Sequence, residues 1–287
     1  MSLWTPAIDK LIAFALTEDI GHGDITTENL ITPQAQGIGE IVAKEACVLA
    51  GLAIAQQVFT KLDSSMTVTS NFKDGDSVTI GEVVLTARGT LHGLLLGERT
   101  ALNFLQRLSG IATHVRTYAD LLVGRPTRLV DTRKTTPGWR TLEKYAVRMG
   151  GGENHRTGLY DGVLIKDNHI AVCGGISAAV ATVRKRISHL IKIEVEAATL
   201  AEVQEAIDAG ADTIMLDNMD LPMIRTAVAL IGGRALVEAS GRVHLENLTD
   251  LADAGVDIIS VGALTHSAKS VDLSMRIQGK EPAEKIP

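Results

Sequence analysis

The stretch ALVEASGRVHLENLTDLADAGVDIISVGA, residues 235–263, contains two strand patterns separated by a helix pattern. Residues 235–240 and 257–263 are short and rich in apolar side chains, which is typical of parallel strands buried on both faces. Residues 244–256 between them repeat leucine at helical spacing and end near Gly255, a residue type that commonly terminates helices. A strand, a helix and a second strand in this order form one unit of a parallel α/β fold.

The same order of elements recurs through the second half of the chain. The last three strand patterns begin about every 22 residues, which is the size of one β/α unit of a barrel. Six strand patterns follow residue 125: TRLVDT (127–132), GVLIKD (162–167), LIKIEVEA (190–197), DTIMLDN (212–218), ALVEAS (235–240) and DIISVGA (257–263). A closed TIM barrel needs eight units. We therefore predict an irregular or incomplete α/β barrel, with an open doubly wound sheet as the alternative, because periodicity does not reveal closure.

The first half of the chain has a different pattern. Residues 66–89, MTVTSNFKDGDSVTIGEVVLTARG, alternate apolar and polar side chains between Asp-Gly and Gly-Glu turns, which predicts strands of a sheet. Residues 53–62 and 97–122 have helical periodicity. We predict an N-terminal α/β sandwich domain over residues 1–110, to which residues 270–287 can return, and a catalytic barrel over residues 111–269.

Composition limits the possible functions. The chain has 287 residues, and 28 Lys and Arg against 34 Asp and Glu give a net charge of −6, which does not indicate a nucleic-acid surface. No apolar run is long enough to span a bilayer, and the N-terminus lacks the features of a signal peptide. Cys47 and Cys173 follow no metal or redox spacing, so we expect two buried thiols. The protein is predicted to be soluble and cytoplasmic.

Polar residues follow the predicted strands at their carboxyl ends, the face where α/β barrels carry their active sites. The clusters are residues 131–134, residues 166–169, Glu194 and Glu196, residues 217–218, Glu238 with residues 240–241, and Gly262. The alternative is that these residues cap helices and satisfy turns, which we prefer for Asp217 and Asn218, or for Ser240, taken alone. That alternative is weak for six strand ends together.

Several cations are expected at this same face of the barrel. Unpaired cations repel one another, so such a group needs an anion or nearby carboxylates. The residues are Arg133, Lys134, Arg156 and Lys166, together with His155. Structural ion pairs with Glu143, Glu153 and Asp161 are the alternative to an anion site. The arginine fork suits carboxylates and phosphates, so we predict an anionic ligand.

Two late loops and two acids complete the predicted site. The loops in EASGR (238–242) and SVGAL (260–264) are small and weakly charged, as expected for a phosphate site made by backbone N–H groups. Glu196 and Asp217 end adjacent strands. They can hold Mg²⁺, directly or through water, or accept hydrogen bonds from ribose hydroxyls. A general acid/base pair is the alternative role.

Long motifs of this chain resemble those of a known enzyme family. Residues 131–170, DTRKTTPGWRTLEKYAVRMGGGENHRTGLYDGVLIKDNHI, are similar to the signature block of quinolinate phosphoribosyltransferase, the carboxylating nicotinate-nucleotide pyrophosphorylase. This family is a type II phosphoribosyltransferase. EDIGHGDITT (18–27), GERTALNFLQRLSGIAT (97–113), IEVEA (193–197), IMLDNM (214–219) and EASG (238–241) follow the family in the same order. The resemblance covers nearly the whole chain.

The resemblance implies an open α/β sandwich followed by an irregular barrel, in a subunit that assembles as a homodimer or a multiple of it. It also implies a reaction in de novo NAD biosynthesis: with Mg²⁺, quinolinate and phosphoribosyl pyrophosphate (PRPP) give nicotinate mononucleotide, pyrophosphate and CO₂. Arg99 precedes every barrel strand, so we expect the partner subunit to contribute it.

The resemblance also implies roles for individual residues. The implied ligands of quinolinate and pyrophosphate are Arg99, Arg133, Lys134, His155, Arg156 and Lys166. Glu196 and Asp217 match the acids that face the ribose and Mg²⁺, although Glu194 is the other possible match in the first motif. The implied 5′-phosphate loops are Ser240 with Gly241 and Gly262 with Ala263, and the substrate-binding set extends to Thr132, Arg242 and Val261. Arg242 stands where some relatives have a second glycine.

The substrate explains the cations of the predicted site. Quinolinate carries two adjacent carboxylates, and the departing pyrophosphate needs positive charge, which Lys134, Lys166 and Mg²⁺ can supply. Lys134, Lys166, Glu196 and Asp217 are the predicted catalytic residues. A sister phosphoribosyltransferase for another acid, a Schiff-base aldolase using Lys166 and a phosphosugar-binding protein are the alternatives.

Overall fold

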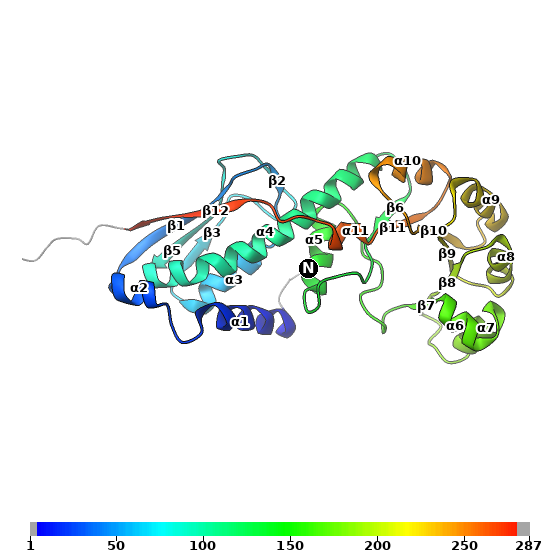
Figure 1. The fold of residues 1–287 in the computed structure, drawn as a ribbon, viewed down its shortest axis with the longest axis horizontal. Coiled ribbons are helices and arrows are strands. Elements are labelled where there is room, and N and C mark those ends of the chain that lie inside the picture. The colour runs from blue at the N-terminus through cyan, green and yellow to red at the C-terminus, as the bar shows by residue number, and fades with distance from the viewer. Residues whose placement is uncertain (1–4, 280–287) are drawn as a thin grey trace, which may run out of the picture. The chain divides into compact units, whose positions relative to one another are not determined.

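The structure, a computed structural model, describes residues 5–279. These residues form two compact units (Figure 1). The first contains residues 5–114, 141–151 and 268–279, and the second contains residues 115–140 and 152–267. Helix α4 (Leu91–Leu121) runs without a break through residue 110, where the sequence predicted a domain boundary, so that boundary stays a prediction.

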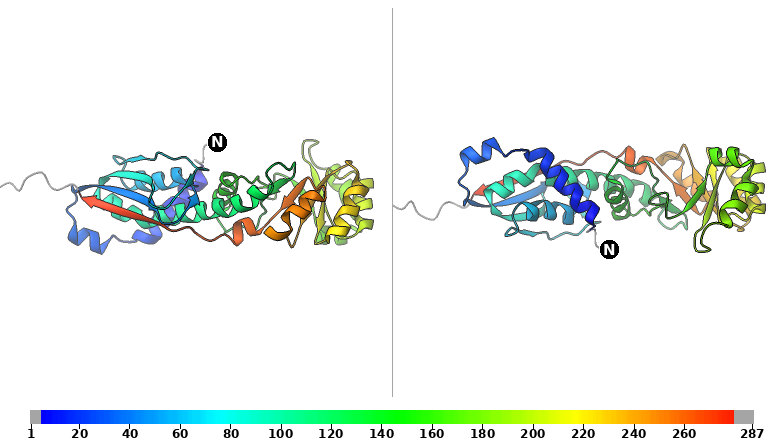
Figure 2. Two further views of the ribbon diagram at one scale, coloured as in Figure 1. Left: turned by 90° about the horizontal axis from the view of Figure 1, so that it is seen from above. Right: turned by 90° about the horizontal axis from the view of Figure 1, so that it is seen from below.

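The first unit is built on a four-stranded antiparallel sheet. Its order is β12-β1-β5-β3, and β1 (Gln36–Ala43) pairs with both β5 (Val83–Thr90) and β12 (Leu273–Gly279). Strand β3 (Thr67–Thr69) extends the sheet beyond β5. Figures 1 and 2 show β12, in red, alongside β1, in blue. The end of the described chain therefore belongs to the sheet formed by its beginning.

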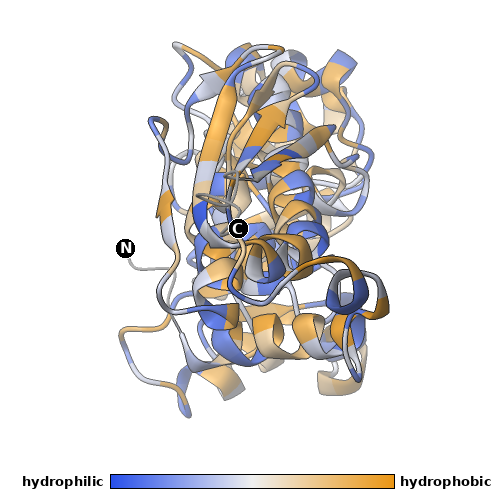
Figure 3. Cartoon of the chain, turned by 90° about the vertical axis from the view of Figure 1, so that its left-hand side faces the viewer, coloured by the Kyte–Doolittle hydropathy of each residue, from blue (hydrophilic) through white to orange (hydrophobic). Residues whose placement is uncertain are grey.

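The remaining elements of the first unit pack around this sheet. Residue burial alternates along β1, as expected for a strand with one face on a core. Large side chains that are fully buried, including Ile41, Ile54 and Phe59, form the core. Hydrophobic and hydrophilic stretches alternate on the helices in Figure 3, the amphipathic pattern expected for helices that cover a core. The other elements are α1 (Pro6–Ile20), α2 (Ile25–Leu30), β2 (Cys47–Val48), α3 (Leu52–Leu62) and β4 (Ser77–Val78).

Helix α5 (Arg140–Met149) has most of its residues in the first unit, although it follows the first strand of the second unit in the chain. The Tyr145 hydroxyl donates a hydrogen bond of 2.6 Å to Asp74. Glu143 is fully buried and pairs with Arg107 at 2.9 Å. These contacts hold the helix against the sandwich.

The second unit is built on a six-stranded sheet in the order β6-β11-β10-β9-β8-β7. Every neighbouring pair is parallel. The strands are β6 (Arg128–Val130), β7 (Val163–Ile165), β8 (Ile193–Ala197), β9 (Thr213–Asp217), β10 (Leu236–Ser240) and β11 (Ile258–Ser260). All six lie within the predicted strand patterns. Within the described residues β6 and β7 are the two edges and do not pair, so the predicted incomplete α/β barrel is confirmed.

The helices that connect these strands lie on the outer side of the curved sheet (Figure 1). They leave the carboxyl ends of the strands to the connecting loops. These helices are α6 (Asp167–Cys173), α7 (Ile176–Arg184), α8 (Leu200–Asp208), α9 (Leu221–Ile231) and α10 (Leu245–Asp253), and the short helix α11 (Ala263–His266) follows the last strand, β11. Thr199 and Glu202 form a capping box at the start of α8, and Asp220 accepts a hydrogen bond from Met223 N at the start of α9.

The two cysteines have different surroundings. Cys47 on β2 is buried, as expected, and burial raises the pKa of its thiol to about 11. Cys173 is exposed, so its predicted burial was wrong. It ends α6, a seven-residue helix with no buried side chain, and the general preference of cysteine for cores does not apply there. No helix within residues 5–279 has the length and apolar character needed to cross a membrane.

Candidate active site

A cavity of about 470 Å³ lies at the carboxyl ends of the strands of the second unit. Most of the predicted site residues line it. They are Thr132, Arg133, Lys134, His155, Arg156, Lys166, Asp217, Ser240, Gly241 and Arg242. Residues from four separate strand ends are therefore brought together by the parallel sheet, as its geometry requires.

Some predicted residues lie next to the cavity rather than on its wall. The carboxylate of Glu196 is 2.7 Å from the Lys166 ammonium. Gly262 lies against Lys134, because a Cβ atom at Gly262 would be 2.7 Å from Lys134 Cδ. Val261 is buried, and its N–H donates to the Val130 carbonyl. Val261 thus stabilises the loop after β11 from its buried side.

Two predicted residues lie further from this lining. Ala263 begins helix α11 directly after Gly262. Arg99 lies on α4 in the first unit, so it is not part of the set that the second unit assembles by itself.

The buried acid Asp131 fixes the segment that carries His155 and Arg156. Asp131 follows β6 and has no exposed surface. Its carboxylate accepts hydrogen bonds from Asn154 Nδ2 at 2.7 Å and from His155 N at 2.9 Å. The Arg156 guanidinium donates to the Gly162 carbonyl at 3.2 Å. The backbone of His155 is thus anchored to the end of β6, and the Arg156 side chain is anchored to the residue before β7, in the absence of any ligand.

The acids proposed as structural partners of the cations are used elsewhere. Glu143 pairs with Arg107, and Glu153 pairs with Arg128. Asp161 accepts the backbone N–H groups of Thr157 and Gly158. Glu143 and Glu153 thus pair with cations outside the cluster, whereas the charge of Asp161 acts on Arg156 and opposes the lowering of its pKa.

Burial and like charge act together on the cation cluster. Burial lowers the pKa of Arg156, and the nearby charge of Arg133 lowers it further. Lys166 forms an ion pair with Glu196. An anion in the cavity would relieve the repulsion between Arg133 and Arg156, which favours a strongly anionic ligand.

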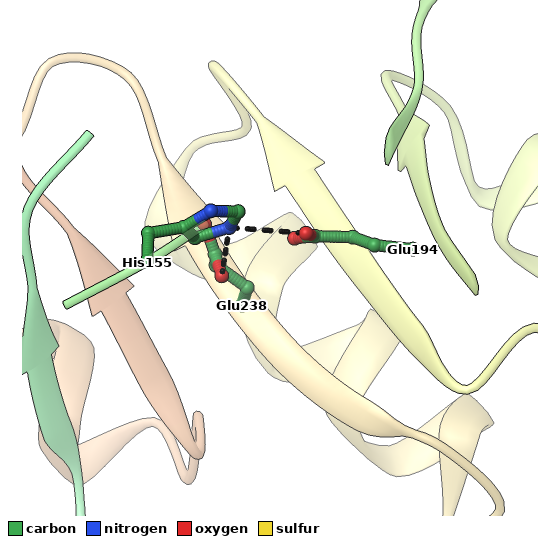
Figure 4. A group of neighbouring side chains, drawn as sticks. All are labelled: His155, Glu194 and Glu238. Carbon is green, nitrogen blue, oxygen red and sulfur yellow. Dashed lines mark ion pairs between the residues drawn. The ribbon is translucent and has the colours of Figure 1, made fainter. Parts of the chain in front are cut away.

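His155, Glu194 and Glu238 form a group of neighbouring side chains (Figure 4), of which His155 and Glu238 line the cavity. His155 Nε2 lies 3.0 Å from Glu194 and 3.4 Å from Glu238, and the three side chains are 15%, 11% and 1% exposed. His155 Nδ1 accepts the Arg156 N–H at 2.8 Å. In the neutral ring the hydrogen therefore sits on Nε2 and points at the two carboxylates.

The charges of this group are strongly coupled. Burial lowers the pKa of His155, but the hydrogen bonds that the ring donates to Glu194 and Glu238 outweigh this and raise it to about 10. Protonation would place a hydrogen on Nδ1 and break the bond from Arg156 N–H, so the upward direction rests on the two carboxylates alone. Burial raises the pKa of Glu194, and the charge of Glu238 contributes in the same direction. One Oε1 of each glutamate is buried without a hydrogen-bond partner.

This buried group and the pair Glu196 and Asp217 are two candidate metal sites. In the buried group the Nε2 hydrogen of the neutral ring points at the carboxylates, so His155 is oriented as a donor and not as a metal ligand. Glu196 and Asp217 end adjacent strands, and each uses one oxygen, for Lys166 and for Asn218 Nδ2. Their other oxygens suit Mg²⁺, which prefers carboxylates and water. The donor set of Glu196 and Asp217 fits Mg²⁺ better.

The loop after β10 approaches the loop after β9 closely. Gly241 has φ +81°, and a Cβ atom there would overlap with the Asn218 side chain. Asn218 itself has φ +56° and donates to Asp217 at 2.7 Å. A glycine is therefore required at position 241, both for its conformation and for the space.

Several cavity residues were not in the predicted site. They are Leu164, Met215, Asn218, Glu238 and Ser260. Glu238 and Asn218 were noticed as polar strand ends, and the alternation of inward and outward residues along a strand could have identified Glu238 and Ser240 as facing the same way. Leu164 and Met215 carry no signal in the sequence that separates them from other core residues.

Comparisons with known proteins agree on one family. A model described as quinolinate phosphoribosyl transferase, C-terminal domain, matches residues 111–276, and the N-terminal domain model matches residues 24–109. A Bacillus subtilis protein described as a probable nicotinate-nucleotide pyrophosphorylase (carboxylating) is 47% identical over 270 residues, 94% of this chain and 93% of that protein. A Synechocystis protein with the same description is 49% identical over 273 residues, 94% and 92% of the two chains.

Solved structures give the same result. NadC from Streptococcus pyogenes matches with a TM-score of 0.94 and 44% identity, covering 98% of this chain and 100% of that chain. The nicotinate-nucleotide pyrophosphorylase from Francisella tularensis matches with a TM-score of 0.91 and 39% identity, covering 96% and 98% of the two chains.

Proposed function

The chain belongs to the quinolinate phosphoribosyl transferase family, and from this membership we propose how its cavity carries out the reaction. The family resemblance of the motifs is thereby confirmed. The enzyme transfers the phosphoribosyl group of PRPP to quinolinate with loss of CO₂, and forms nicotinate mononucleotide and pyrophosphate in NAD biosynthesis. The observation that carries the assignment is a match over nearly the whole chain, together with a cavity lined by five lysine and arginine residues.

Quinolinate binds against the arginines. Arg133 and Arg156 each present a planar fork that matches a carboxylate, and the substrate has two carboxylates. The hydrogen bonds from His155 N–H to Asp131 and from the Arg156 guanidinium to the Gly162 carbonyl hold this part of the cavity in place before binding. In the free enzyme the two neighbouring cations repel each other, which costs free energy. Binding of the dianion removes this repulsion. Binding energy of this kind orients the pyridine nitrogen for attack at the anomeric carbon.

Lys134 and Lys166 stabilise the leaving pyrophosphate. Both ammonium groups line the cavity, and their flexible chains can follow a group that moves away. As the bond from the ribose to pyrophosphate breaks, negative charge grows on the leaving oxygen while positive charge grows on the ribose ring. The lysines stabilise the first charge, and the carboxylates of Glu196 and Asp217 stabilise the second.

Glu196 and Asp217 are also the residues that would hold Mg²⁺. The ion would add positive charge next to the phosphates of PRPP. The ion pair between Lys166 and Glu196 couples the pyrophosphate side of the cavity to this acidic pair. Two phosphate-binding loops complete the assignment: Ser240 with Gly241, and Gly262 with Ala263, bind the 5′-phosphate.

The oligomer and the location are further parts of the proposal. We propose a homodimer in which Arg99 of the partner subunit reaches quinolinate, which the family resemblance supports. We also propose a cytoplasmic enzyme. Some relatives are described as mitochondrial or chloroplastic, so a fractionation experiment with the native organism tests this part.

The choice of substrate tests the proposed function. With PRPP and Mg²⁺, we expect turnover of quinolinate and at least about 100-fold less of nicotinate, because a cationic site that lacks one of its two carboxylate partners is left with an unpaired buried charge. Product formation is measured by chromatography for both acids at equal concentration. Equal turnover of the two acids would contradict the dicarboxylate assignment.

A further inference from the structure

Glu238 is an acid at a position where a carboxylate is costly. It lies on β10, lines the 470 Å³ cavity and is 1% exposed. Within residues 5–279 its ion-pair partner is His155, and its Oε1 is buried without a hydrogen-bond partner. A buried carboxylate that no lysine or arginine neutralises lowers stability. An acid kept in such a place indicates a functional role.

Glu238 and Glu194 hold the ring of His155 from two strands. Nε2 lies 3.4 Å from the carboxylate on β10 and 3.0 Å from the carboxylate on β8 (Figure 4). A ring nitrogen that faces two carboxylates keeps its hydrogen whether the ring is neutral or charged. The sheet therefore fixes the orientation of the ring, although His155 itself belongs to a loop.

The other ring nitrogen distinguishes the two charge states. In the neutral ring, Nδ1 accepts the Arg156 N–H at 2.8 Å, so both nitrogens are satisfied within the protein. In the charged ring, Nδ1 carries a hydrogen, and the Arg156 N–H is released. These two N–H groups can then donate to the same carboxylate, and both residues line the cavity. The charged form of His155 is therefore the form that can bind a carboxylate through the ring.

Charged groups on several elements act on His155. Cations that line the same cavity oppose its protonation, and burial does so as well. The carboxylates of Glu194 and Glu238 outweigh burial and raise the pKa of His155 to about 10. The surrounding charged groups are Asp131, Arg133 and Lys134 after β6, Arg156 on the same loop, Lys166 after β7, Glu194 on β8 and Glu238 on β10.

We propose that Glu238 is a positioning residue for quinolinate, which keeps His155 charged and oriented and thereby determines the pH range over which the cavity binds a dicarboxylate. The inference rests on the proposed function and adds a residue to it. Glu238 acts through His155, so its loss affects quinolinate and not PRPP. Glu194 shares this task, but it is two residues from Glu196. Substitution of Glu238 therefore tests the inference without a change on the strand of the proposed Mg²⁺ site.

Calorimetry of quinolinate binding to Glu238→Gln tests the inference. Glutamine keeps a hydrogen-bond acceptor for Nε2 but removes the charge, so the pKa of His155 should fall from about 10 toward 6.5. At about pH 6 the ring is charged in both proteins, and the affinities should agree within about threefold. At about pH 8.5 the ring is charged only in the wild type. The variant should then bind quinolinate about tenfold more weakly, the loss of one charged hydrogen bond.

Two further variants serve as controls. Glu246→Gln makes the same chemical change at an exposed residue in the first turn of α10, and it should bind quinolinate like the wild type at both pH values. Glu238→Asp keeps the carboxylate, so its affinity should depend less on pH than that of Glu238→Gln. Initial rates give the corresponding kinetic result. KM for quinolinate should rise with pH in Glu238→Gln, whereas KM for PRPP should match that of the wild type at both pH values.

Nitrogen NMR of the histidine rings tests the wild type itself. The His155 signal is assigned by its loss in His155→Gln, and it should remain that of a charged ring above about pH 8. Titration of the wild-type ring at or below about pH 6.5 would overturn the inference, and this result does not require a folded variant. Unchanged affinity in Glu238→Gln, or an equal loss at both pH values, would also overturn it. A wild type that binds quinolinate and titrates as expected but forms no nicotinate mononucleotide would instead refute the proposed function.

Discussion

Substitution of Gly241 by alanine tests the proposed 5′-phosphate loop. The new Cβ would overlap with Asn218 Oδ1 and lie 3.1 Å from Asn218 N. Asn218 cannot move freely, because its side chain donates to Asp217 at 2.7 Å. Gly124 provides a matched control. It has φ +82° against +81° for Gly241, and a Cβ atom there would have no neighbour within 4 Å.

The expected magnitudes follow from this geometry. Alanine in the left-handed region costs about 1 kcal/mol, and this cost applies to both variants. Displacement of Asn218 breaks its bond to Asp217, which adds about 1 kcal/mol for Gly241→Ala. The free energy of unfolding should therefore fall by about 2 kcal/mol for Gly241→Ala and by about 1 kcal/mol for Gly124→Ala. The displaced loop should also raise KM for PRPP by about tenfold in Gly241→Ala, which corresponds to roughly one lost phosphate contact.

Urea unfolding and initial-rate kinetics measure the two effects. The control is expected to lose stability and keep wild-type KM for both substrates. The decisive quantity is the ratio of KM for PRPP between the two variants at saturating quinolinate. An unchanged KM for PRPP in Gly241→Ala, with the protein folded, would remove this loop from the substrate site. An equal rise in both variants would show that the kinetic change follows from general destabilisation.

Two further predictions concern charge and assembly. The pKa of His155 is raised from 6.5 to about 10, so its contribution to stability is present below pH 6.5 and is lost as the pH rises toward 10. The free energy of unfolding should fall over this pH window, and it should fall less in Glu238→Gln, which lacks one of the two carboxylates. Urea titrations at several pH values measure this fall. A steeper fall in the variant than in the wild type would contradict the role of Glu238. Arg99→Ala and Lys134→Ala should each be nearly inactive, whereas mixed dimers should recover up to about half of the wild-type activity per dimer, because one site then carries both lesions and the other carries none. Verified mixed dimers without recovery would show that Arg99 does not act across the subunit interface.

The parallel half of the fold could be predicted from the sequence because its signals are local. Each strand is a short apolar run that ends in polar residues. This pattern lies within the strand itself and does not depend on which strands pair with it in the sheet. The carboxyl ends of parallel strands meet at one edge, so strand-end residues such as Lys166, Asp217 and Gly241 could be placed together before the structure was known. All three residues line one cavity of the second unit.

Other parts of the structure depend on contacts between distant residues. Helix α5 lies in the first unit through the contacts of Tyr145 with Asp74 and of Glu143 with Arg107, and nothing near α5 in the sequence indicates these partners. The interaction of His155 with Glu194 and Glu238 depends on where the loop that carries His155 lies relative to strands β8 and β10, which carry the two glutamates. The periodicity of apolar residues in the sequence predicts that these strands exist, but it does not predict which of their side chains contact one another.

Local chemistry also limits what the sequence can show. The exposure of Cys173 follows from the shortness of α6 rather than from the residue type. The positive φ of Arg242 contradicts the conformational preference of arginine, and the Arg242 carbonyl accepts a hydrogen bond from Asn247 five residues later. Residues that violate their local preferences in this way are found at functional sites, where the tertiary structure overrides the sequence signal.

Release of CO₂ from quinolinate tests the central claim most directly. The purified protein is incubated with Mg²⁺, PRPP and quinolinate that carries a labelled carboxyl carbon at position 2, and CO₂, pyrophosphate and the nucleotide product are measured together. We predict equal amounts of CO₂, pyrophosphate and nicotinate mononucleotide, formed only when quinolinate and PRPP are both present. Absence of labelled CO₂ from a folded protein, or pyrophosphate release that does not depend on quinolinate, would contradict the account.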